Sequence, residues 1–112
     1  MLKTVNLKED NFNVELALAV VEIEIECAKR EGRAALKLLH GYGSHGRGGV
    51  IAIEVRKALF HWKKSGFITD YFGGDRWNMF EKCSQRILLK DKDIYADEDM
   101  GKANPGITIV EI

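Results

Sequence analysis

Apolar residues recur three or four positions apart in two long stretches of the chain, which is the spacing of one face of an α-helix. The first stretch follows Asn13, a residue type that caps helix N-termini, and predicts a helix over residues 14–30 that Gly32 ends. The second predicts a helix over residues 50–65 that Gly66 ends. Each of these amphipathic helices can bury one face against a sheet.

Short apolar runs between and beside the helices predict the strands. These runs are residues 3–7, 35–39, 67–72 and 107–112, and the last follows the turn sequence Asn104-Pro105-Gly106. A third helix, capped by Asp75, is expected before the last strand. Its buried face would carry Trp77, Phe80, Cys83 or Ser84, and Ile87. Residues 90–104 are charged and have no period, so we expect an exposed connection there.

Strands and helices alternate along the chain in the order strand, helix, strand, helix, strand, extra helix, strand. This order indicates an α/β fold built from βαβ units with a largely parallel sheet. Because there are two main helices, we expect a two-layer sandwich rather than a doubly wound sheet. The length of 112 residues suits a single domain, residues 1–112, and 46% hydrophobic and 30% charged residues are ordinary for a globular protein.

The location of the protein follows from what its sequence lacks. No apolar run approaches the roughly 20 residues of a membrane span, and the first residues lack the apolar core of a signal peptide. Cys27 and Cys83 lie far apart and have neither a CxxC nor a metal-ligand spacing, so we expect two reduced thiols and no metal site. The interpretation is a cytoplasmic protein that does not act at a membrane.

Charge is distributed unevenly, although the net charge is zero. Residues 34–66 carry six basic side chains and one acidic side chain, Glu54, whereas both flanks are acidic. A local excess of positive charge on a neutral chain indicates one cationic site and argues against a surface that is basic throughout.

The segment between the second strand and the second helix is the candidate for chemistry. Residues 40–49 hold five glycines, whose backbone can approach a ligand closely and direct N–H groups at an anion. The following helix adds the positive end of its dipole, and Arg47 adds a guanidinium that suits phosphate oxygens. His40 and His45 are candidate acids or bases near neutral pH. The alternative is that this segment is only a tight connection.

Two common phosphate motifs do not fit this loop. Gly41, Gly43 and Gly46 have the GxGxxG spacing, but Lys63 and Lys64 occupy the region where a dinucleotide site needs an acidic residue. No Lys-Ser or Lys-Thr pair follows the glycines, which excludes an ATPase-type phosphate loop. The loop therefore predicts a phosphate site of another kind.

Basic and aromatic residues of the second helix extend the candidate site. Arg56 and Lys57 could contact further phosphates, although a solvated helix face is the alternative for each residue. Phe60, Trp62 and Trp77 could stack on bases or fill the core, and for Trp62 we expect the core.

The segment Leu38-Leu39-His40-Gly41-Tyr42-Gly43, the later Val55-Arg56-Lys57-Ala58-Leu59 and the closing residues 104–112 resemble the Smr (small MutS-related) domain. The resemblance covers roughly residues 3–112. It implies a two-layer sandwich with a four-stranded mixed sheet and two main helices in the order βαβαββ, like the C-terminal domain of translation initiation factor three. The extra helix then belongs to an insertion at about 75–102.

The resemblance also implies a function. Smr domains bind nucleic acids, and some members nick branched or duplex DNA while others cleave RNA. On this analogy His40, Gly41 and Gly43 form the HGxG motif of the family, which is implicated in binding and cleavage.

The chain departs from the family at its first strand. Family nucleases carry Asp-x-His there after an apolar residue, whereas this chain reads Val5-Asn6-Leu7-Lys8. Asn6 can form hydrogen bonds but cannot act as a base. The family also places a Leu-Arg pair at the start of the second helix, a position that falls near Ala52 here, so Arg47 is the candidate replacement.

Three hypotheses follow. The first is a nucleic-acid-binding domain without nuclease activity, and its candidate contacts are His40, Gly41, Gly43, Ser44, Gly46, Arg47, Gly48, Gly49, Arg56 and Lys57. The second is an endonuclease in which His40 or His45 works with a carboxylate such as Glu9 or Asp10, and with Mg²⁺ if a metal is used. The third is an interaction module whose basic loop is covered by a lid, formed by Asp91, Asp93, Asp97, Glu98 and Asp99. For these residues the alternative is a solvated linker.

Overall fold

The computed structural model describes residues 2–8, 13–41 and 47–112, with the backbone alone for Arg47 and Gly48. The elements are β1 (Lys3–Asn6), α1 (Val14–Glu31), β2 (Ala35–Leu39), α2 (Arg47–Ser65), β3 (Asp70–Gly73), the 3-10 helix η1 (Gly74–Arg76), α3 (Lys82–Lys90), the 3-10 helix η2 (Lys92–Ala96) and β4 (Ile107–Glu111). No helix in the described ranges is both long and apolar enough to span a bilayer.

The four strands form one mixed sheet in the order β1-β2-β4-β3. β1 and β2 are parallel, and β4 is antiparallel to both of its neighbours. All five residues of β4 are buried, because this strand is central and both faces of the sheet are covered. The predicted α/β fold with a four-stranded mixed sheet is confirmed. The expectation of a largely parallel sheet is wrong, because among the described strands only β1 and β2 pair in parallel.

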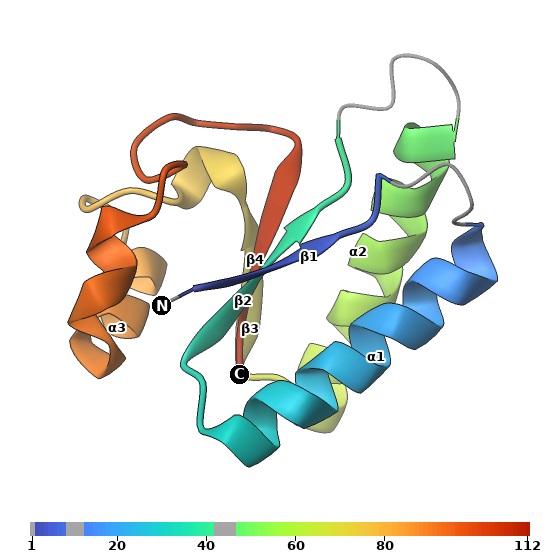
Figure 1. The fold of residues 1–112 in the computed structure, drawn as a ribbon, viewed down its shortest axis with the longest axis horizontal. Helices are drawn as coiled ribbons and strands as arrows, with labels where there is room; N and C mark the ends of the chain where they lie inside the picture. Colours follow the sequence, from blue (N-terminus) through green and yellow to red (C-terminus); the bar gives the residue numbers. More distant parts are fainter. Residues whose placement is uncertain (1, 9–12, 42–46) are drawn as a thin grey trace.

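α1 and α2 lie side by side on one face of the sheet (Figure 1). Val21 and Ile25 of α1 pack with Val55 and Leu59 of α2 over Leu38 of β2, and all five side chains are fully buried. α1 begins and ends where the sequence predicts. The Oδ1 atom of Asn13 accepts the N–H of Leu16 at 2.8 Å, and Gly32 closes the helix with φ of 70°.

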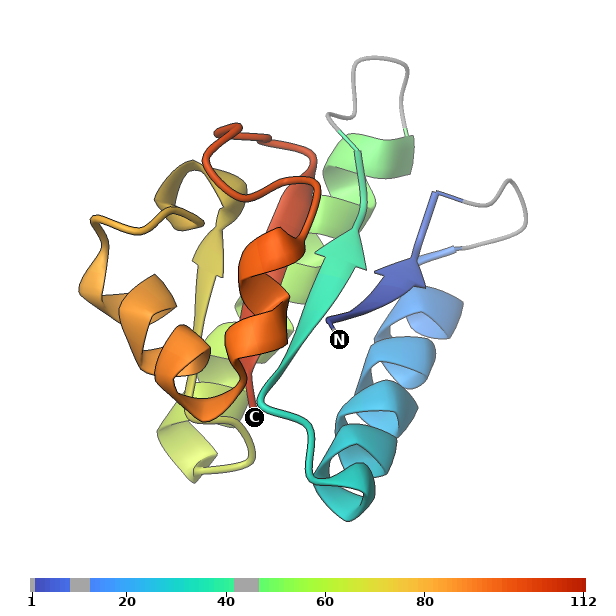
Figure 2. The same cartoon turned by 60° about the vertical axis from the view of Figure 1, so that its left-hand side comes forward.

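The segment between β3 and β4 covers the other face of the sheet, as Figure 2 shows from a second direction. Trp77, Ile87 and Ile94 are buried there against Phe72 and Ile109. The prediction of an exposed connection over residues 90–104 is therefore wrong for η2, because Ile94 gives it an apolar anchor in a surrounding of charged side chains.

The third helix begins later than the sequence predicts. η1 ends at Arg76, and α3 starts only at Lys82, so Trp77 and Phe80 do not belong to it. The cause is Asn78, whose Oδ1 accepts the N–H groups of Phe80 at 2.9 Å and Glu81 at 3.2 Å. A side chain that binds nearby N–H groups in this way competes with helix formation.

The starts of α2 and β3 also differ from the predictions, each by three residues. α2 starts at Arg47 instead of Val50, although it then includes two glycines, which disfavour helices. β3 starts at Asp70 instead of Phe67, because the N–H groups of Phe67 and Ile68 bind the carbonyl of Trp62 and prolong the end of α2.

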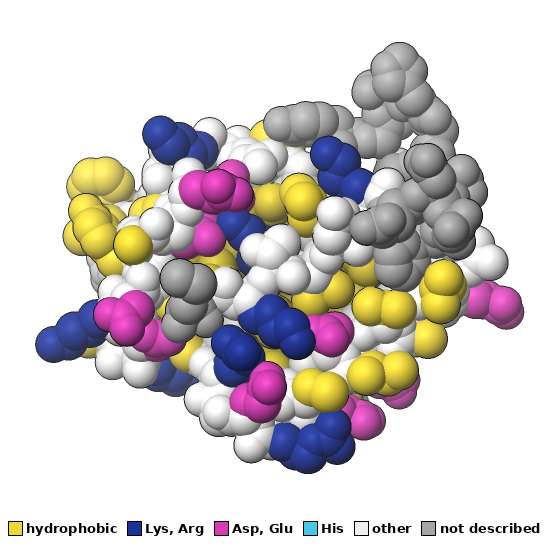
Figure 3. Space-filling view, viewed as in Figure 1, with side chains coloured by type: hydrophobic (Ala, Val, Ile, Leu, Met, Phe, Trp, Pro, Cys, Tyr) yellow, Lys and Arg dark blue, Asp and Glu magenta, His cyan; other side chains and the backbone are white. Residues whose placement is uncertain are grey.

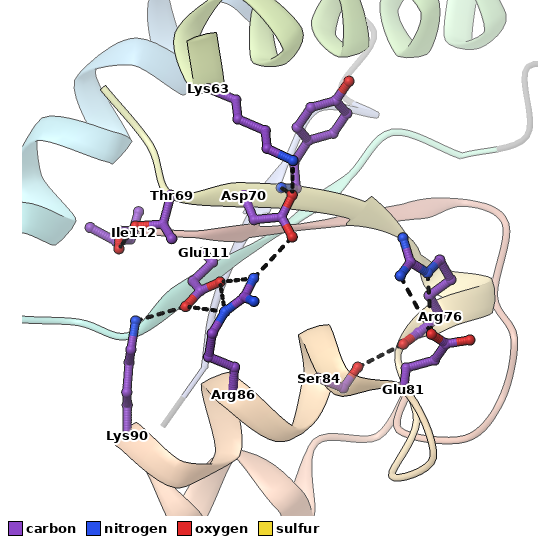
Figure 4. A network of polar contacts seen from close by, with 11 residues as sticks. Lys63, Thr69, Asp70, Arg76, Glu81, Ser84, Arg86, Lys90, Glu111 and Ile112 are labelled. Carbon is purple, nitrogen blue, oxygen red and sulfur yellow. Dashed lines mark hydrogen bonds and ion pairs between the residues drawn. The ribbon is translucent and has the colours of Figure 1, made fainter. Parts of the chain in front are cut away.

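A charged network joins α2 and α3 to the edge of the sheet (Figure 4). Glu111 of β4 is fully buried, and its carboxylate accepts hydrogen bonds from Arg86 Nε at 2.8 Å and Lys90 Nζ at 2.7 Å. Arg86 also binds Asp70 of β3 at 3.0 Å, and Asp70 accepts from Lys63 of α2 at 2.9 Å. The insertion is thus attached to the sheet by ion pairs as well as by apolar contacts.

Candidate functional site

The glycine-rich loop leaves the sheet at His40 and Gly41, directly after β2. The N–H groups of both residues donate to the carbonyl oxygen of Gly106, each at 3.0 Å. The Oδ1 atom of Asn104 accepts the N–H of Gly106 at 2.8 Å and holds this turn in shape. Gly41 has φ of +76°, a conformation that favours glycine. The first residues of the loop are therefore fixed to the turn that precedes β4.

The imidazole of His40 is almost completely buried and binds protein atoms at both nitrogens. Nδ1 lies 3.0 Å from the carbonyl oxygen of Gly41, and Nε2 lies 2.8 Å from Oγ1 of Thr108. A carbonyl oxygen can only accept, so Nδ1 carries the proton and donates. In the neutral ring Nε2 then accepts from the hydroxyl of Thr108.

The surroundings of His40 favour its neutral form. Burial lowers the pKa of His40 below its ordinary value, and the positive charge of Arg56 lowers it further, while the hydrogen bond to Gly41 acts in the opposite direction. The ring is therefore uncharged at neutral pH. With both nitrogens engaged, it orients the start of the loop.

Lys8 is a neighbour of the loop that no sequence pattern indicated. The N–H of Leu7 donates to the carbonyl of Leu39 at 2.8 Å, so the chain continues beside β2 beyond the end of β1. A Cβ atom placed on Gly41 would lie 3.5 Å from Cδ of Lys8, which shows that the Lys8 stem runs past Gly41. The contact follows from the parallel pairing of Asn6 with Leu39, a register that the sequence alone does not specify.

A hollow of 320 Å³ lies between the start of α2 and the turn before β4. It is lined by Gly41, Gly49, Ala52, Ile53, Arg56 and Pro105. Arg56 is exposed, and none of the described carboxylates forms an ion pair with it. The hollow therefore combines a glycine backbone, the first turns of a helix and a guanidinium available to an anion.

The described members of the predicted site lie at the hollow, beneath the start of the loop and along α2. Gly41, Gly49 and Arg56 line the hollow, His40 lies buried beneath the start of the loop, and Lys57 lies farther along α2. Gly43, Ser44, His45 and Gly46 lie outside the described residues, as do Glu9 and Asp10. Arg47 and Gly48 open α2, but their side chains are not described.

Two carboxylates of the acidic segment bind a strand lysine. Lys37 of β2 is 3% exposed, and its Nζ atom lies 2.9 Å from Asp97 and 2.6 Å from Asp99. Burial alone would lower the pKa of Lys37, but the hydrogen bonds to Asp99 and Asp97 outweigh it and raise the pKa. Asp97 also accepts from Trp77 Nε1 at 3.1 Å. These two carboxylates hold the insertion on the sheet face away from α2.

Ligands for a metal ion do not gather in the described part of the chain. Across residues 2–8, 13–41 and 47–112, no three His, Cys, Asp or Glu side chains lie close enough together to hold one. Asn6, at the position of the family's aspartate, uses its Oδ1 atom to accept the N–H of Lys8 at 2.9 Å.

Comparison with known proteins supports the fold. No protein-family model matches the chain, and no curated protein matches it. The structure is similar to the crystal structure of the Smr domain of MutS2 from Thermus thermophilus, with a TM-score of 0.60 and 24% sequence identity. The match covers 98% of this chain and 96% of the other. The chain therefore has the fold of an Smr domain, the domain family that its sequence resembles.

Proposed function

We propose that this chain is a nucleic-acid-binding domain that holds backbone phosphates in the hollow at the start of α2. The observation that carries this proposal is the position of Arg56, which lines the hollow beside Gly41 and Gly49 without a described carboxylate partner. A phosphate there would meet a guanidinium, backbone N–H groups and the positive end of a helix.

Lys8 supports the proposal from the other side of the loop. Its stem runs past Gly41, which brings a second cationic side chain to the start of the loop. In family nucleases the corresponding position is the histidine of Asp-x-His. A lysine in this place retains attraction for phosphate while it removes a base that works near neutral pH.

The contacts of His40 favour binding without cleavage. His40 is buried and neutral, and both of its ring nitrogens bind protein groups, so it is better suited to shaping the loop than to moving a proton. We therefore assign His40 as a positioning residue. His45 is the remaining histidine of the nuclease hypothesis.

Fluorescence anisotropy with branched DNA, duplex DNA and structured RNA tests the binding proposal. Arg56→Ala and Lys8→Ala should each weaken binding and each lower the slope of log affinity against log salt by about 1, as expected for one lost phosphate contact. Lys82→Ala is the matched control, because Lys82 is exposed on α3 at the opposite face of the sheet. Absence of binding to all three probes at physiological salt would refute the proposal.

A plasmid-nicking assay with and without Mg²⁺ tests the absence of cleavage. We expect the supercoiled plasmid to stay intact with the wild-type protein. Nicking that His45→Ala abolishes would instead support the endonuclease hypothesis.

A further inference from the structure

A second hollow of 410 Å³ lies on the outer face of α2. It is lined by Ile53, Arg56, Lys57, Phe60 and His61, and it shares Ile53 and Arg56 with the hollow beside the glycine loop. The two hollows therefore form one strip along the helix, and a ligand held in the first can extend into the second.

The floor of this second hollow is apolar and exposed. The Ile53 side chain is 54% exposed and that of Phe60 is 48% exposed, and a separation of seven positions, about two helical turns, places both on one face of α2. The Nζ atom of Lys64 lies over the Phe60 ring, 5.1 Å from its centroid, and the His61 ring meets it nearly edge-on with 5.6 Å between centroids. These contacts lie over one face and at the edge of the Phe60 ring, which stays about half exposed.

The charges around this floor select the kind of partner. α2 carries five basic residues and one acidic residue, Glu54, which pairs with Lys57 at 2.9 Å. α1 has the opposite character, because it carries five glutamates and two basic residues. In Figure 3 hydrophobic and acidic side chains lie together over α1, where Leu16 and Ile23 are exposed. A polyanion with flat apolar groups fits α2 and is repelled by α1.

We propose that this strip binds an unpaired nucleotide, whose base stacks on Phe60 beside Ile53 while its phosphates contact Arg56 and Lys57. The proposal rests on nucleic-acid binding at the first hollow and adds that the partner has unpaired bases within reach of it. A paired base inside a duplex is already stacked on both sides and cannot offer a face to Phe60. An aromatic surface of this kind accepts any base, so the site selects for strand state and not for sequence.

Anisotropy with two probes tests this site: a labelled single-stranded oligonucleotide and the blunt-ended duplex of the same strand with its complement. Phe60→Ala should lower the affinity for the single strand by about five- to a hundredfold, the usual effect of losing one base–aromatic stack. The affinity for the duplex should change less than about twofold. Phe60→Trp should restore single-strand binding, because its larger ring also stacks. The matched control is Phe80→Ala, since the Phe80 side chain is 93% exposed and belongs to the segment between β3 and β4, which covers the other face of the sheet.

The outcomes separate this inference from the proposed function. If Arg56→Ala weakens both probes while Phe60→Ala changes neither, the stacking site is refuted and phosphate binding stands. An equal loss on both probes also refutes stacking. Binding of neither probe by the wild-type protein refutes both proposals. Sedimentation tests whether a second copy of the chain occupies the strip instead. If the protein is a dimer that Phe60→Ala dissociates, and the nucleic-acid affinity is unchanged, the strip is a self-association surface and the inference is overturned.

Discussion

The hydroxyl of Thr108 donates to Nε2 of His40 over 2.8 Å and so joins the end of β2 to β4. Thr108 pairs with Leu38 across the two strands, so its side chain points to the face that α1 and α2 cover. His40 follows two residues after Leu38 and lies on the same face. The glycine loop is therefore positioned by a residue 68 places later in the sequence.

Replacing Thr108 by Val tests this hydrogen bond, because valine keeps the shape and the β-branching of threonine. The buried Nε2 atom would then lack a donor, and we expect a loss of about 1–3 kcal/mol in the free energy of unfolding, measured with urea. Thr4→Val, at an exposed position of β1, should change the free energy by less than about 0.5 kcal/mol. Equal effects of the two substitutions would contradict the assignment.

The lowered pKa of His40 predicts a loss of stability as the solution is acidified. The unfolded chain binds a proton near the ordinary pKa of 6.5, whereas the folded chain resists protonation at this ring. Stability is therefore fully present above pH 6.5 and is lost as the pH falls below it toward the lowered pKa, at up to about 1.4 kcal/mol per pH unit.

Urea unfolding between pH 7 and pH 5 measures this dependence. His40→Gln should flatten the profile in that range, and Thr4→Val, which removes no titratable group, should leave it unchanged. A wild-type stability that stays constant over the range would contradict the neutral assignment of His40.

Much of the fold could be predicted because local signals and packing agree. Asn13 and Gly32 bound α1 in the sequence and in the structure. The β-branched run of β4 suits a strand buried on both faces. The position of β4 between β2 and β3 was not evident from local patterns, because strand order depends on how the whole chain packs.

Features that depend on single side chains were harder to predict. The Asn78 side chain delays α3, and one apolar residue, Ile94, turns a charged stretch into part of the core. At the site, the sequence singled out Gly41 and Arg56, which line one hollow, but not the burial of His40 or the contact with Lys8. Those depend on the register between strands, which a single sequence does not specify.

The buried Lys37 cluster predicts a large effect of one substitution. Lys37→Met would leave Asp97 and Asp99 without their cation at a mostly buried position, and we expect a loss of about 3–5 kcal/mol in the free energy of unfolding. Adding Asp97→Asn and Asp99→Asn should recover part of the loss, because the triple variant buries no unpaired charge. Lys92→Met at an exposed position is the control. If the loss in the triple variant equals the sum of the losses in the three single variants, the lysine and the two aspartates are not coupled, and the prediction fails.

The lid hypothesis and the structure predict different effects of the acidic segment on nucleic-acid affinity. Asp93 and Glu98 are exposed acidic residues of the segment between β3 and β4, which covers the face of the sheet opposite α2. The double variant Asp93→Asn with Glu98→Gln should therefore leave nucleic-acid affinity unchanged. An increase in affinity, measured by anisotropy, would instead favour a lid.

The lowered pKa of Glu111 predicts a second loss of stability, at a lower pH than that of His40. Burial acts to raise the pKa of Glu111, but hydrogen bonds from Arg86 and Lys90 outweigh it and lower the pKa below the ordinary 4.5. The stability from this lowered pKa is present above pH 4.5 and is lost as the pH falls through the lowered value.

Arg86→Met should reduce the free energy of unfolding by about 1–3 kcal/mol at pH 7 and flatten the pH profile of stability below pH 4.5, without changing the part of the profile that depends on His40. Arg76→Met, which breaks the exposed pair with Glu81 at 3.4 Å, should do neither. An acid profile that Arg86→Met leaves as steep as the wild type would show that the Glu111 network does not control acid unfolding.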